Sequence, residues 1–84
     1  METKRKNAVL KKFGAAVRRY RRIAGLTQEE FADICELDRS YLGGVERGER
    51  NLTLINVIKI CDALKVNASE MLADLNKWSK QKEL

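Results

Sequence analysis

The amino-acid sequence predicts an all-α protein, a compact domain of five helices. Apolar residues recur at three- and four-residue steps along most of the 84 residues, and no segment alternates apolar and polar residues long enough to form a strand. The chain contains no proline, the residue that disrupts a helix interior most strongly. With 44% hydrophobic residues, it suits one domain with a modest core. We expect a flexible basic arm at 1–7, the folded domain at 8–75 and a C-terminal extension at 76–84.

The first helix is expected from about Ala8 to Ala24, where one face carries apolar residues at helical spacing. Gly25 ends the pattern, since glycine readily adopts the left-handed conformation that closes a helix. The apolar residues of this face are Val9, Phe13, Val17 and Tyr20.

Two short helices joined by a tight turn are expected next, near 27–35 and 38–47. Thr27 can cap the first of them, with Glu30 three residues later completing a capping box. Asp38 is the N-cap candidate of the second. Their buried sides consist of Phe31, Ile34 and Cys35 in the first helix and of Leu42 and Val45 in the second.

A loop at 48–51 leads to a fourth helix near 53–65, which Thr53 can cap. Asn67 or Ser69 begins a fifth helix. The last ten residues either extend the fifth helix or fray. We expect the fourth helix to turn Leu54, Val57, Ile58, Cys61 and Leu64 inward, and the fifth to carry Met71, Leu72 and Leu75.

Charge is distributed unevenly along the chain, whose formal net charge is +5. Residues 1–25 hold nine Lys or Arg against one acid, whereas residues 26–50 hold seven acids against three Arg. A basic chain often binds an anionic polymer, most commonly nucleic acid, although solubility alone can explain a moderate excess. Charge therefore makes a nucleic-acid partner plausible without proving it.

The composition argues against several other functions. No segment approaches the roughly 20 apolar residues of a membrane span, and the N-terminus lacks an apolar secretory segment. Cys35 and Cys61 each fall on an apolar stripe, so we expect buried reduced thiols in a cytoplasmic protein, a disulfide being the alternative. With no histidine, no Cys-x-x-Cys pair and no glycine-rich phosphate loop, the sequence predicts no metal, no cofactor, no catalytic residue and no enzyme activity.

Several motifs taken together resemble the Cro/repressor (Xre-type) helix-turn-helix family, over about Phe13 to Leu72. These motifs are Arg21, Gly25–Ala32, Arg39–Leu42, Val45–Gly48 and Asn51–Leu54. Within the family, the segments 37–41 and 46–53 and the short length are most similar to the controller proteins of restriction–modification systems. The resemblance implies a lambda-repressor-like DNA-binding domain. It also implies a homodimer that binds double-stranded operator DNA upstream of its own gene and of the endonuclease gene.

The resemblance further implies how the DNA is contacted. The helix near 38–47 enters the major groove and the helix near 27–35 crosses the phosphate backbone. Gln28 is either a phosphate contact or a solvated first-turn residue, and Arg50 reaches either a groove edge or only a phosphate. The base-contacting candidates are Arg39, Ser40, Tyr41 and Arg50, and the phosphate-contacting candidates are Thr27, Gln28, Arg47 and Asn51.

Gly43 and Gly44 are unusual inside a short helix, since each costs roughly 1 kcal/mol relative to alanine. Gly44 falls where several relatives place a second base-reading side chain. Either the helix approaches the DNA closely here, or nothing is needed at this position. In both cases more of the readout must come from Arg39, from residues 47–50 or from DNA deformability.

Arg21 and Glu46 match a buried ion pair that ties the first helix to the major-groove helix in relatives, so we expect a structural role for both. The basic arm can lie along the DNA or enter a minor groove, with a plain solvated tail as the alternative. The other arginines of the first helix are expected to form a solvated face, the alternative being that one of them lies near a phosphate; they are Arg18, Arg19 and Arg22.

Apolar residues that remain after the core is filled predict a subunit interface. A dimer is expected because one recognition helix reads few base pairs. The alternative is that the C-terminal tail folds back onto its own domain. The predicted interface consists of Ile55, Ile60, Met71, Leu75 and Trp78.

The predicted function is therefore a sequence-specific transcriptional regulator of the controller type, located in the bacterial cytoplasm at the nucleoid. A phage Cro-like repressor or the antitoxin of a toxin–antitoxin pair, both of the same fold, is the alternative. We expect no membrane partner. With no second domain, there is no evident place for a small-molecule effector, and a contact with RNA polymerase stays open.

Overall fold

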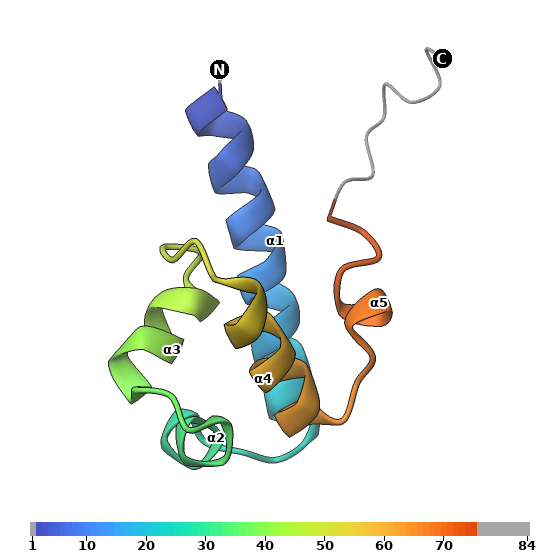
Figure 1. Ribbon diagram of the computed structural model, residues 1–84. Coiled ribbons are helices and arrows are strands. Elements are labelled where there is room, and N and C mark those ends of the chain that lie inside the picture. The colour runs from blue at the N-terminus through green and yellow to red at the C-terminus, as the bar shows by residue number, and fades with distance from the viewer. Residues whose placement is uncertain (1, 76–84) are drawn as a thin grey trace.

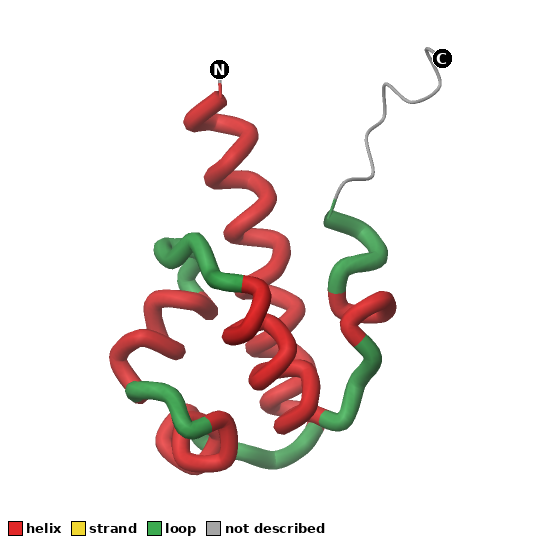
Figure 2. The backbone as a smooth tube through the Cα atoms, in the orientation of Figure 1, coloured by secondary structure: helices red, strands yellow, loops and turns green. Residues whose placement is uncertain are grey.

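The computed structural model describes residues 2–75, with side chains from residue 7 onward, and this part of the chain is entirely helical apart from short loops (Figures 1 and 2). The all-α prediction is confirmed. In chain order the helices are α1 (Glu2–Ile23), α2 (Gln28–Cys35), α3 (Arg39–Glu46), α4 (Leu54–Leu64) and α5 (Ala68–Met71).

Helix α1 is the long central element, and α3, α4 and α5 all pack against it (Figure 1). It begins at Glu2 and not near Ala8, so residues 2–7, predicted as a flexible arm, continue the helix instead. Lys, Arg and Glu in this segment are good helix formers, and neither glycine nor proline interrupts it. The first turns of α1 project beyond the other helices in Figure 1.

Local capping signals define the starts of the later helices. The Thr27 hydroxyl accepts from the Glu30 backbone N–H at 3.1 Å, and the Glu30 carboxylate accepts from the Thr27 N–H at 2.9 Å, which completes the predicted capping box. At the start of α4 the Thr53 hydroxyl accepts from the Asn56 backbone N–H at 3.1 Å, a cap without the reciprocal bond. Gly25, with φ of 76°, follows α1 as expected.

The core lies between α1 and the other helices. Leu54 and Ile58 of α4, predicted to face inward, are 72% and 42% exposed, and Ile34 of α2 is 54% exposed. Helix α4 is apolar on nearly every side, so its spacing alone does not select the buried face. The buried apolar residues are Phe13, Val17, Phe31, Ala32, Cys35, Leu42, Val45, Ile60, Cys61 and Met71.

Helix α3 lies unusually close to α1 because Gly14 has no side chain. A Cβ atom on Gly14 would lie 2.2 Å from the Val45 carbonyl oxygen and 2.6 Å from that of Glu46. Gly48, just after α3, is equally close to α1, since a Cβ atom there would lie 2.8 Å from the Lys11 Cα. The C-terminal end of α3 is therefore held directly against the α1 backbone.

None of the helices in the described part of the chain combines the length and the apolar character that crossing a membrane requires.

Candidate DNA-binding site

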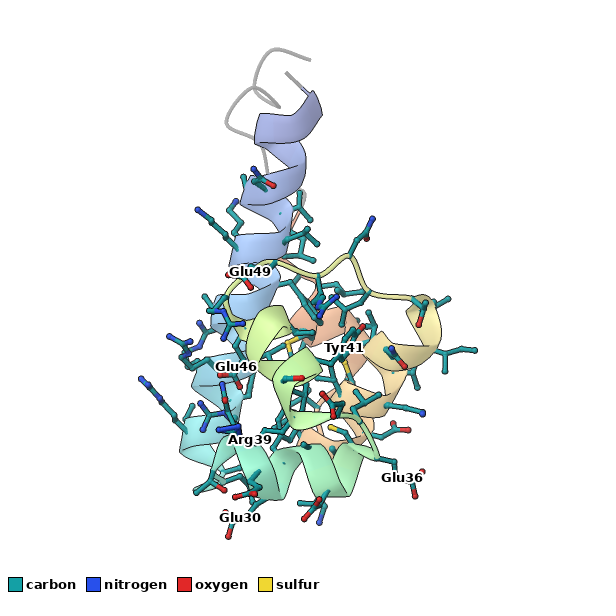
Figure 3. The ribbon with its side chains drawn as sticks, turned by 90° about the vertical axis from the view of Figure 1, so that its left-hand side faces the viewer. Glu30, Glu36, Arg39, Tyr41, Glu46 and Glu49 are labelled. Carbon is teal, nitrogen blue, oxygen red and sulfur yellow. The ribbon has the colours of Figure 1, made fainter. Side chains whose placement is uncertain are left out.

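Helices α2 and α3, joined by a tight turn, form a helix-turn-helix unit on one side of the molecule (Figure 3). The turn contains Glu36 in the left-handed conformation, with φ of 60°, and ends at Asp38. One Asp38 carboxylate oxygen accepts from the backbone N–H groups of Ser40 and Tyr41 at 3.1 and 3.3 Å, so the predicted cap of α3 is confirmed.

The Ser40 hydroxyl also donates to Asp38. This bond and the Tyr41 backbone N–H lower the pKa of Asp38 below its ordinary value. Because the hydroxyl proton is used within the protein, Ser40 presents lone pairs outward. In this arrangement it suits a base-edge donor such as the amino group of adenine or cytosine.

Arg39 and Ser40 are both exposed at the N-terminal end of α3. The Arg39 side chain is labelled in Figure 3, where α3 lies toward the viewer. Tyr41 is half-buried, and its hydroxyl oxygen accepts from the Asn56 side-chain amide at 3.1 Å. Helix α4 therefore braces the Tyr41 ring, and the tyrosine O–H proton remains available to a base or phosphate acceptor.

The loop after α3 contributes two exposed arginines to the same region. The Arg50 guanidinium carbon lies 5.6 Å from the centre of the Tyr41 ring, in a cation–π arrangement. The Arg47 Nε lies 3.1 Å from a carboxylate oxygen of Glu49, and both of these side chains are more than half exposed. Such a surface pair contributes little stability and leaves Arg47 free to exchange Glu49 for another anion.

The predicted phosphate contacts at the start of α2 have partners inside the protein. The Gln28 side-chain amide donates to Glu46 at 2.9 Å, and the Thr27 hydroxyl serves the cap of α2. One N–H of the Gln28 amide is left for a phosphate oxygen, so these two contacts stay predictions. Asn51, the last of the phosphate candidates, is exposed in the loop before α4.

Glu46 is the centre of a buried polar cluster that fixes α3 to α1 and α2. Its carboxylate accepts from Arg21 Nε at 2.6 Å and from Arg21 Nη2 at 3.0 Å, where the sequence predicts a buried ion pair. Arg21 Nη1 donates in addition to the Leu26 carbonyl oxygen at 2.8 Å. Arg18, predicted on a solvated face, joins the cluster with its Nε 3.3 Å from the carboxylate.

The pKa values of this pair follow from its surroundings. The Glu46 side chain is fully buried, and burial by itself would raise the pKa of the carboxyl. Hydrogen bonds from Arg21 and Gln28 outweigh burial, so the pKa lies below its ordinary value of 4.5. The hydrogen bond to Glu46 raises the pKa of Arg21 in turn. Both groups are therefore charged in the folded protein, and the cluster is structural.

Both cysteines are buried and free. Burial raises the pKa of the Cys35 thiol to about 11, and burial also raises that of Cys61. Thiols in such surroundings stay protonated and unreactive near neutral pH. Within the part of the chain that the structure describes, no group of three or more His, Cys, Asp or Glu residues is arranged to hold a metal ion.

The predicted subunit interface is only partly exposed. Ile60 and Met71 lie in the core, at 0% and 3% exposure, so they cannot belong to a surface patch. Leu75 is half-buried against the same core, and Trp78 lies outside the described residues. Ile55 is 70% exposed as predicted. With the exposed side chains of Leu54 and Ile58, it forms an apolar surface at the start of α4, which we call the α4 patch.

Comparison with known proteins agrees with this geometry. A family model described as helix-turn-helix matches residues 17–71. Control protein C.SmaI of Serratia marcescens is 46% identical over 56 residues, which cover 67% of this chain and 67% of that protein.

Solved structures of controller proteins have the same fold. The restriction–modification controller protein C.AhdI of Aeromonas hydrophila is 48% identical, with a TM-score of 0.72 over 74% of this chain and 94% of that chain. The controller protein C.Esp1396I, solved as a tetramer in complex with its natural 35 base-pair operator, is 34% identical in sequence. Its TM-score is 0.72, covering 80% of this chain and 88% of that chain.

Proposed function

Because this chain belongs to the helix-turn-helix family, among the control proteins of restriction–modification systems, we propose that it is a regulator that binds operator DNA through α3. The observation that carries the proposal is the exposed pair Arg39 and Ser40, placed at the leading end of a rigidly held α3. The same fold binds a 35 base-pair operator in C.Esp1396I. A control protein of this kind acts as a regulator and not as an enzyme.

The chemistry of α3 suits direct readout in the major groove. Arg39 can donate two parallel hydrogen bonds to O6 and N7 of a guanine, and Ser40 can accept from a neighbouring amino group. Arg47 and Asn51, exposed in the segment that follows α3, suit phosphate oxygens. Thr27 and Gln28 lie at the N-terminal end of α2, whose backbone N–H groups and dipole favour a further phosphate.

Replacing Arg39 by alanine tests this proposal. The affinity for a specific duplex should fall by about 10- to 100-fold relative to a scrambled duplex, because one bidentate contact with guanine is lost. The specific duplex is the one that the wild-type chain enriches from a randomised pool. Fluorescence anisotropy measures both affinities. The salt concentration is held fixed, because non-specific binding changes steeply with it.

Arg19→Ala is the matched control, since it removes the same charge from an exposed site on α1, beside Tyr20. It should weaken both duplexes alike and leave their ratio unchanged. Equal ratios for Arg39→Ala and wild type would rule out base readout by Arg39. Failure of the wild-type chain to enrich any duplex would refute operator binding itself.

Two copies of the chain are proposed to bind the operator as a homodimer that is joined through the α4 patch. One α3 contacts few base pairs, and a two-fold symmetric dimer doubles the number of base pairs that are contacted. Leu54 and Ile55 are 72% and 70% exposed, which leaves a cluster of large apolar side chains in contact with water unless a partner covers it. The patch keeps Ile55 from the predicted interface and excludes the buried Ile60 and Met71, whereas Leu75 and Trp78 stay predictions.

Ile55→Asp should raise the dimer dissociation constant by about 10- to 100-fold, since a carboxylate would be buried at the centre of the patch in each copy. Sedimentation equilibrium over nanomolar to micromolar concentrations measures the change. Ile23→Asp is the control, because Ile23 is 75% exposed and lies on a different helix, α1, beside Arg19 and Arg22. An unchanged dimer in Ile55→Asp would place the interface elsewhere. A monomeric wild type would contradict the homodimer and favour the alternative that the C-terminal tail covers the patch.

The proposed biological role is control of its own gene and of a neighbouring endonuclease gene. The relatives favour this role over a Cro-like repressor or an antitoxin. Occupancy of the operator would then follow protein concentration, with no small-molecule effector, in the bacterial cytoplasm at the nucleoid. A direct contact with RNA polymerase stays a prediction.

A further inference from the structure

Gly44 lies in the middle of α3, the helix that presents Arg39 and Ser40 to the solvent. Gly44 itself is buried. The group that covers it is the side chain of Arg50. A Cβ atom on Gly44 would lie 3.1 Å from both Cγ and Nε of Arg50 and 3.6 Å from its Cδ. The aliphatic part of Arg50 therefore lies directly on the bare backbone of α3.

The guanidinium end of Arg50 is positioned by a second contact, since it lies over the Tyr41 ring. Tyr41 and Gly44 are three residues apart in one helix, so they share a face. Asn56 holds the Tyr41 hydroxyl from α4, which keeps the ring in place. Arg50 comes from an exposed loop, but its side chain lies along one face of α3. Its aliphatic part contacts Gly44, and its guanidinium lies over Tyr41.

This glycine differs from the other close-packed glycines of the protein. At Gly14 and Gly48 an added Cβ would meet backbone atoms, which cannot move without moving a helix. At Gly44 the three nearest atoms all belong to the one flexible side chain of Arg50. Packing of the fold therefore does not require glycine at position 44, and alanine is in addition the better helix former. What the glycine preserves is the position of Arg50.

We propose that Gly44 is a specificity-determining position that acts through Arg50. By having no side chain, it leaves a gap on α3 that Arg50 fills, and the Arg50 guanidinium takes the place of the base-reading side chain that α3 lacks at this position. Arginine suits this role because its planar fork can donate to two acceptors of one guanine. The inference rests on the proposed function, in which α3 enters the major groove.

The free protein provides the first test. Ring current from Tyr41 should shift the Arg50 side-chain resonances in NMR spectra of the wild-type chain. In Gly44→Ala these resonances should shift, because a Cβ atom 3.1 Å from Arg50 forces its side chain to move, while the thermal unfolding midpoint stays the same or rises. Gly43→Ala is the control, since a Cβ there would meet Arg47 and Gln28 and not Arg50. Unchanged Arg50 resonances in Gly44→Ala would overturn the proposal.

The second test is a double-mutant cycle on DNA, with the duplex enriched by the wild-type chain and a scrambled duplex. Gly44→Ala should lower the affinity ratio by about tenfold when Arg50 is present and by less than about twofold in an Arg50→Ala background. An equal loss in both backgrounds would mean that the added methyl group meets the DNA directly, which would overturn the role of Arg50.

The two tests separate the inference from the proposed function. If the wild-type chain discriminates between the duplexes but the cycle shows no coupling, only the assignment of Gly44 fails. If the wild-type chain does not discriminate, operator binding fails and the inference fails with it, whatever the NMR spectra show.

Discussion

Glu46→Ala is expected to lower the free energy of unfolding by about 3–5 kcal/mol. The Glu46 side chain is fully buried and that of Arg21 is only 10% exposed, so the substitution leaves a buried guanidinium without its carboxylate. A domain of this length has a total stability of about 4–13 kcal/mol. Much of the protein should therefore be unfolded in mild urea, which denaturation followed by circular dichroism would show, and DNA binding should be lost with the fold.

The control for this prediction is Glu49→Ala, which removes an exposed acid paired with Arg47. Its effect should stay below about 1 kcal/mol, as for other surface pairs. Equal effects of the two substitutions would contradict the structural role of Glu46.

The contribution of Glu46 should also depend on pH. Its pKa lies below 4.5 in the folded protein, so the unfolded chain binds the proton more readily. The stabilisation is therefore complete above about pH 4.5 and is lost as the pH falls toward the folded-state pKa. Urea titrations should show that Glu46→Gln loses less stability than wild type between pH 5 and pH 3, and parallel losses would contradict this assignment.

Gly14→Ala should lower the free energy of unfolding by about 1–3 kcal/mol or more, although alanine favours the helix by roughly 0.5–1 kcal/mol. The added Cβ would lie 2.2 Å from the Val45 carbonyl oxygen, so α3 would have to move away from α1. Operator affinity should fall as well, because the displaced helix carries Arg39 and Ser40.

Gly44→Ala is the matched control for Gly14→Ala, since the same atom is added in a helix but meets only a flexible side chain. Thermal and urea unfolding of the two variants measure the difference. If Gly14→Ala is as stable as Gly44→Ala, the close contact of α1 with α3 does not limit the fold.

Interactions over a few residues explain why much of this architecture could be read from the chain. The caps at Thr27, Asp38 and Thr53 are hydrogen bonds to residues two or three positions away, so the residue types alone predict them. They place the starts of α2, α3 and α4, and with them the exposed position of Arg39 at the front of α3. The helix-turn-helix motifs are also short segments, and their resemblance to a family predicted how the helices are arranged in the fold.

Contacts between distant segments explain the wrong predictions in α4, whereas the wrong start of α1 has a local cause. Helix α4 is apolar on nearly every side, and only its packing against α1, α2 and α5 placed Ile60 inside and left Leu54 and Ile58 in contact with water. Residues 2–7 continue α1 because nothing in that segment ends a helix, although their charge resembles that of an arm.

The sequence by itself determined the order of the helices, the starts of α2, α3 and α4 and the residues at the leading end of α3, because caps, spacing and turns are encoded within a few positions. Only the tertiary structure decided which groups meet across those helices. It brought Arg18 and Gln28 to Glu46, and it laid Arg50 on Gly44. Side chains far apart in the chain acquire these partners only when packing has set the distance and rotation of each helix, and spacing along one helix does not contain that information.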